Sequence, residues 1–156
     1  MRSLLLVVTW LTCACYSAKG AIVVLNGLTH VHNSVRGGEF LGKVRLKNDG
    51  EAPVRVLIYS RDFLVECGKP SEYVKASGAH HSLSSWLTLA VDEKTLPPGE
   101  EYEVEYRVKI PESGMTDGSF WQVLMVEGAD PVGVESVSGI TVNSKVRYAI
   151  QVIVNV

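Results

Sequence analysis

The chain has 156 residues, of which 46% are hydrophobic, and its formal net charge at pH 7 is -2. This length fits one domain with a single modest core. The slightly acidic balance lacks the positive surface that nucleic-acid binding requires, so the sequence excludes nucleic acid and other polyanions as expected partners.

The first twenty residues have the pattern of a secretory signal. Arg2 supplies a positive charge, residues 4–11 form a short apolar run, and small or polar residues follow as far as Gly20. The run is shorter than the roughly 20 apolar residues that cross a bilayer. We therefore predict an exported protein of the periplasm or cell surface, with a signal peptide at 1–20. In an alternative prediction, residues 12–15 form a degenerate lipobox and Cys15 is lipidated, which would anchor the protein to the membrane.

Alternation of apolar and polar residues predicts strands throughout the remaining chain. The clearest case is 101–110, where Glu101, Glu103 and Glu105 alternate with apolar residues and form the solvated face of a strand. Asp49-Gly50 between two strand-like runs indicates a hairpin or another tight connection. In chain order, the expected strands are 21–25, 40–47, 53–61, 72–76, 86–91, 101–110, 120–126 and 145–156, of which 72–76 and 86–91 have the weakest patterns.

This pattern predicts an all-β fold. Short strands separated by turn residues, with no helical periodicity after the signal, are typical of an antiparallel immunoglobulin-like β-sandwich of about seven strands. We expect one such domain at 21–156. Cys67 is the single cysteine in that range, so packing and not an internal disulfide must stabilise it.

Catalytic signatures are missing from the sequence. It contains no Gly-x-Ser-x-Gly elbow, no His-Glu-x-x-His motif and no glycine-rich phosphate loop. We therefore predict that the protein is not an enzyme and uses no cofactor.

The four histidines suggest a metal-binding alternative. His30 and His32 would point to the same side of a strand, and His80 and His81 could add ligands for zinc or copper. The competing interpretation makes both pairs polar loop residues, because turn-forming residues surround them. The alternative function is a periplasmic metal-binding protein.

Several turn and core segments together resemble the N-terminal immunoglobulin-like domain of the periplasmic pilus chaperones (PapD-like superfamily) and related bacterial surface and cell-wall-binding domains. The resemblance covers most of 21–156, and its motifs specify fold better than function. It rests on residues 37–40, 44–50, 53–54, 84–87, 96–100 and 118–121.

The resemblance implies a non-catalytic protein-binding or structural module of the bacterial envelope. The alternative is a pilus-chaperone-like assembly factor that acts by strand addition and holds another envelope or surface protein with its last strand. The family's second, cleft-forming domain and the basic residues in its cleft have no clear counterpart in 21–156.

The matching last strand is 145–156, where apolar residues alternate on one face. They would either fill a partner's groove or form this domain's own core. On the other face, Ile153 among polar neighbours is a candidate contact residue, and Lys145 and Arg147 are candidate anchors for a partner.

Overall fold

The structure, a computed structural model, describes residues 22–75, 78–129 and 146–156. The described residues form only strands and connecting loops, so no helix among them is long and apolar enough to cross a membrane. The strands are β1 (Ile22–Val24), β2 (Thr29–Asn33), β3 (Glu39–Asn48), β4 (Val54–Leu64), β5 (Glu72–Val74), β6 (Leu87–Leu89), β7 (Glu93–Leu96), β8 (Glu101–Lys109), β9 (Ser119–Ala129) and β10 (Arg147–Asn155).

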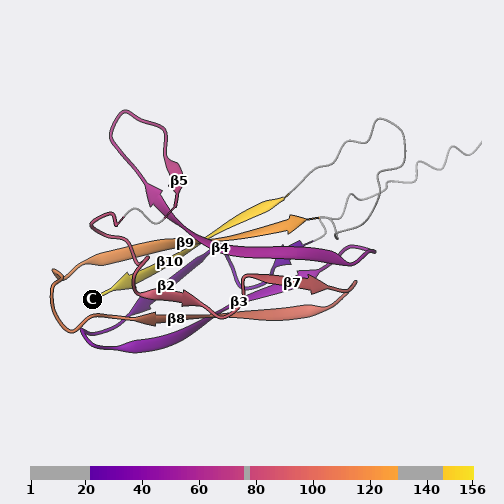
Figure 1. Cartoon of the computed structure of the whole chain (residues 1–156), viewed down its shortest axis with the longest axis horizontal. Coiled ribbons are helices and arrows are strands. Elements are labelled where there is room, and N and C mark those ends of the chain that lie inside the picture. Colours follow the sequence, from indigo (N-terminus) through magenta and orange to yellow (C-terminus); the bar gives the residue numbers. More distant parts are fainter. Residues whose placement is uncertain (1–21, 76–77, 130–145) are drawn as a thin grey trace, which may run out of the picture.

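These strands form two sheets, as expected of an immunoglobulin-like sandwich (Figure 1). The first sheet has the order β1-β3-β8-β6, and all its neighbours are antiparallel. The second has the order β2-β10-β9-β4-β5, and β7 also pairs with β4. In Figure 1 the β4–β5 hairpin projects away from the two layers.

The core lies between the sheets and is built from the inward residues of the alternating strands. Val104, Tyr106 and Val108 of β8 are 0–1% exposed, and Ile150, Val152 and Val154 of β10 are fully buried. The alternating apolar residues of the last strand are therefore this domain's own core. The two ends of the predicted segment 145–156 depart from this pattern, because Val146 is 43% exposed and Tyr148 and Val156 are half-buried.

A glycine in β3 makes room for the largest buried side chain. Gly42 lies opposite Tyr106 in the β3–β8 register, and Tyr106 is 1% exposed. A Cβ on Gly42 would overlap the Tyr106 ring. The phenol therefore fills the space that a side chain at position 42 would need.

Of the two alternatives for Asp49-Gly50, the turn is a tight connection and not a hairpin, because β3 and β4 lie in different sheets and the turn carries the chain between them. Residues 29–33 form a strand and not a loop, since they pair in parallel with Gln151–Asn155. The first part of the chain thus contributes one strand to each sheet.

Candidate partner-binding site

The outer face of the first sheet is charged and internally neutralised. Cations on one of the strands β3 and β8 lie opposite carboxylates on the other. The glutamates of 101–105 therefore form the solvated side of a strand, as predicted. Pairing with Lys43, mainly through a hydrogen bond, lowers the pKa of Glu103. The closest pairs are Lys43 with Glu103 (2.7 Å), Arg107 with Glu39 (2.6 Å) and Arg45 with Glu101 (3.1 Å).

The outer face of the second sheet is different in character. Ile153 lies between Val31 of β2 and Trp121 of β9, so three apolar side chains form a row across neighbouring strands. Val123 and Met125 continue the outward side of β9 and are only 3% and 4% exposed. Because Val123 and Met125 are buried, we call only Val31, Ile153 and Trp121 the apolar face. Val31 is its exposed member (58%), and Ile153 and Trp121 are half-buried.

The sequence-predicted contact residues lie on or beside this face. Ile153 is half-buried within the apolar row. Arg147 is exposed, but its guanidinium is already held by Glu127, with Nη2–Oε2 at 2.8 Å and Nε–Oε2 at 3.0 Å. The Tyr59 hydroxyl donates to the same Glu127 oxygen. Lys145 and Cys15 lie outside the described residues.

The two halves of β10 have different edges. β9 pairs with β10 along its whole length, but β2 pairs only with Gln151–Asn155. The Gln151 N–H donates to the Leu28 carbonyl (2.8 Å), so odd-numbered residues of β10 direct their backbone groups toward β2. By this alternation, the N–H and C=O of Arg147 and Ala149 point to a side where the described residues provide no strand. This open edge could not be predicted from local sequence patterns, because it depends on where β2 begins along β10.

The histidine pairs are held in separate environments. His30 Nδ1 and His32 Nε2 both lie at hydrogen-bond distance from the Tyr106 hydroxyl, at 3.0 and 2.9 Å. His81 donates from Nδ1 to the Ser119 carbonyl (3.0 Å), and its ring stacks on Trp121. Among the described residues, no group of three or more His, Cys, Asp or Glu side chains could hold a metal ion. The metal-binding alternative therefore gains no support from this arrangement.

The cluster of Tyr106 with His30 and His32 predicts a bell-shaped dependence of stability on pH. Burial, and then the charge of His30, lowers the pKa of His32 below 6.5. As pH falls, His32 therefore takes up a proton in the unfolded chain before it does so in the folded protein. Stability is lost as pH falls from 6.5 through the pKa of His32 in the folded protein. Burial raises the pKa of Tyr106 from 10.0 to about 12, so stability present below pH 10 is lost as pH rises toward 12.

The free energy of unfolding, measured with urea across this pH range, checks both the acidic and the alkaline loss of stability. We expect Tyr106→Phe to flatten the alkaline limb and His32→Gln to reduce the loss just below pH 6.5. Wild-type stability that increases on acidification through this range would contradict the assignment.

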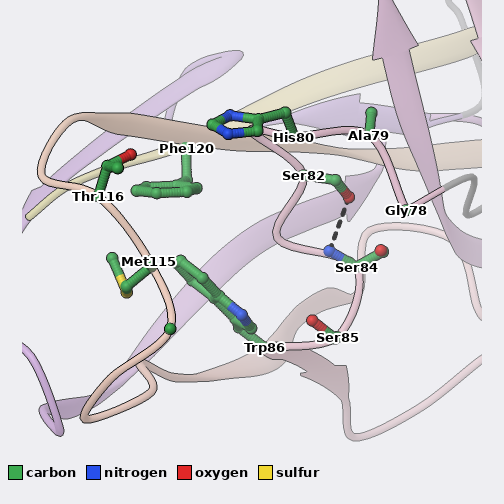
Figure 2. Close-up of a pocket in the computed structure, with 11 residues that line it drawn as sticks. Gly78, Ala79, His80, Ser82, Ser84, Ser85, Trp86, Met115, Thr116 and Phe120 are labelled. Carbon is green, nitrogen blue, oxygen red and sulfur yellow. Dashed lines mark hydrogen bonds between the residues drawn. The ribbon is translucent and has the colours of Figure 1, made fainter.

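A separate pocket of about 500 Å³ lies at one end of the sandwich. Figure 2 shows Trp86, Phe120 and Met115 gathered on one side of it, with serines of the preceding loop nearby. Trp86 packs against Phe120 with ring centroids 4.5 Å apart. The Ser82 hydroxyl accepts a hydrogen bond from the Ser84 N–H (2.9 Å), which shapes the loop (Figure 2). Trp86 is thus a half-buried packing residue that also lines this pocket.

No family model matches the sequence, and no curated protein matches it. Solved structures do match in fold. A PapD-like domain of human CEP192 is 13% identical, with a TM-score of 0.55, covering 86% of this chain and 84% of that domain. The SafB chaperone complex with SafA pilin from Salmonella enterica gives 11% identity, a TM-score of 0.58, and coverage of 89% and 56%.

A chaperone–tip-adhesin complex from Acinetobacter baumannii gives 15% identity, a TM-score of 0.56, and coverage of 86% and 56%. At these identities the likeness establishes the fold. The chain spans about half the length of the chaperone chains that it matches, as the 55% coverage of the fimbrial chaperone CfaA also illustrates.

Proposed function

Because the chain has a PapD-like immunoglobulin-like fold, we propose that it is an exported, non-catalytic, chaperone-like module that binds another protein of the bacterial envelope. Several neighbours of this fold are chaperones in complexes with pilin or adhesin subunits. In this proposal the partner is likewise a surface protein. The fold alone does not carry the proposal, since the same fold is found in a human protein.

The observation that carries the proposal is the open edge at the start of β10. Arg147 and Ala149 direct their N–H and C=O groups away from β9, to a side where the described residues place no strand. An extended segment of a partner can add to such an edge through main-chain hydrogen bonds. The apolar face beside it supplies contacts for the partner's side chains, with Ile153 at its centre. Arg147 is paired with Glu127, but its side chain remains 54% exposed, so its remaining N–H groups can donate to a carbonyl of the partner.

Ala149→Pro tests this edge. Proline removes the N–H that points outward but leaves the ladder with β9, which uses even-numbered residues, and proline is tolerated at strand edges. We expect about a tenfold loss of affinity, since one backbone hydrogen bond is lost and the proline ring obstructs the approaching strand. The probes are pilin or adhesin subunits that lack the strand completing their sandwich, and complexes are quantified by size-exclusion chromatography and calorimetry.

Ala149→Val is the matched control, because it keeps the N–H and suits a strand. Equal binding by the proline and valine variants would rule out strand addition at this edge. Failure of the wild-type chain to bind any incomplete β-sandwich would count against the proposed function as a whole.

A further inference from the structure

The outer edge of β2 lacks the features that usually prevent an edge strand from pairing with another chain. β2 pairs with β10 on one side, and the part of the chain that the structure describes places no strand on the other. Edge strands normally carry charges, prolines or bulges that prevent pairing with another chain. Residues 29–33 contain no Asp, Glu, Lys, Arg or Pro. Nothing in their sequence therefore blocks the addition of another strand.

Apolar side chains are concentrated along the same edge. Val31 is 58% exposed at the centre of β2, and Leu28 (48%) and Val35 (72%) flank it. The nearest cation, Arg36, is already paired with Asp117 at 2.6 Å. The edge thus offers an uncharged strip with exposed aliphatic groups at its middle and both ends, which favours an apolar, uncharged occupant.

The backbone of this strand is directed outward at alternate residues. The Leu28 carbonyl accepts from Gln151, and the Ser34 N–H donates to the Asn155 carbonyl, so even-numbered residues face β10. Thr29, Val31 and Asn33 therefore point their N–H and C=O groups away from the sheet. Their side chains are also exposed.

The sequence of β2 is approximately symmetric about its central residue, Val31. It reads Thr-His-Val-His-Asn, with Val31 in the middle, histidines on either side and small polar residues at the ends. An antiparallel pair related by a two-fold axis at Val31 sets Val31 opposite its own copy, Thr29 opposite Asn33, and His30 opposite His32. Each contact is thus repeated about the axis, as in the isologous interface of a two-fold dimer. The like residues Val31 with Val31 and His30 with His32 bring no opposed charges together.

We propose that two copies of this chain pair through β2 in antiparallel register centred on Val31. Thr29, Val31 and Asn33 then exchange backbone hydrogen bonds with Asn33, Val31 and Thr29 of the second copy. The two second sheets become one continuous sheet, and the apolar faces of both copies join across the axis. This inference goes beyond the proposed function and uses a different strand from the partner-binding edge of β10.

Sedimentation of the purified full chain tests the pairing. We expect a dimer whose dissociation is concentration-dependent, and we expect Val31→Glu to convert it to a monomer by setting two carboxylates opposite each other. Leu41→Glu is the matched control, because Leu41 is also an exposed strand residue (56%) but lies on the first sheet. It should leave the dimer intact, and circular dichroism should show that both variants are folded.

Cysteine cross-linking tests the register. With the native cysteines replaced by serine, Val31→Cys should form a dimer-linking disulfide, because residues in a hydrogen-bonded antiparallel pair have Cα atoms about 5.5 Å apart. Thr29→Cys should not cross-link to itself, since the two copies of residue 29 lie far apart in this register. A monomer at high concentration, a dimer unaffected by Val31→Glu, or equal cross-linking at both positions would overturn the inference. Capture of a different protein at this edge in place of a second copy would also overturn it.

Discussion

Replacing Gly42 by alanine is expected to lower the free energy of unfolding by about 3 kcal/mol, at the upper end of the cost of overpacking a core. The added Cβ would overlap the ring of Tyr106, which is 1% exposed and cannot move outward without leaving the core. The same movement would separate the Tyr106 hydroxyl from His30 and His32. Urea unfolding monitored by tryptophan fluorescence measures the change.

Gly128→Ala is the control for this variant. Gly128 also lies in a strand, and neither glycine has a positive φ angle, so backbone strain affects neither substitution. A Cβ at position 128 would make ordinary contacts with Val54 and Ile22, at 3.7 and 3.8 Å. We expect little change or a small gain in stability there. If Gly42→Ala costs no more than Gly128→Ala, or costs the same in a Tyr106→Leu background, the ring is not the cause.

Replacing Ser82 by alanine is expected to cost about 2 kcal/mol, because the change removes a partner of buried polar groups. The Ser82 hydroxyl donates to the carboxylate of Asp62 (2.6 Å), which is 2% exposed, and it lies 3.2 Å from the side-chain amide of the fully buried Gln122. It also accepts the Ser84 N–H. One hydroxyl thus connects the loop before β6 to both β4 and β9.

Ser85→Ala is the comparison for Ser82→Ala. Ser85 lies in the same loop, but it is exposed, so its loss should change stability by less than about 0.5 kcal/mol. We also expect faster amide hydrogen exchange at Leu83 and Ser84 in the Ser82 variant. Similar unfolding free energies for the two alanine variants would show that the buried hydroxyl has no special role.

Local alternation predicted the strands that have one wet and one dry face. Residues 101–110 are the clearest example, and their alternation specifies β8 together with its buried and exposed sides. The short strands β5 and β6 lie within the weakly patterned segments 72–76 and 86–91. The mostly apolar run 120–126 lies within β9, where Trp121 is on the outer face and not in the core.

The features that could not be predicted depend on distant contacts. Thr29–Asn33 looked like a loop because turn-forming residues flank it, and its strand conformation comes from pairing with residues more than a hundred positions later. Arg147 looked like a free cation, but Glu127 on the neighbouring strand neutralises it. The need for glycine at position 42 follows from the Tyr106 ring across the β3–β8 pair. None of these partners can be read from local periodicity.

The parallel pairing of β2 with β10 also has a consequence for the order of folding. A chain that emerges from its N-terminal end presents Thr29–Asn33 well before their partner Gln151–Asn155, which lies more than a hundred residues later. Until then, β2 has no strand to join and β9 lacks one of its two neighbours. The second sheet therefore closes only after residues 151–155 have appeared, while the β3–β8 pair of the first sheet can form earlier. A chain interrupted before residue 151 would leave β2 without its partner strand and β9 without a neighbour along Ser119–Val123.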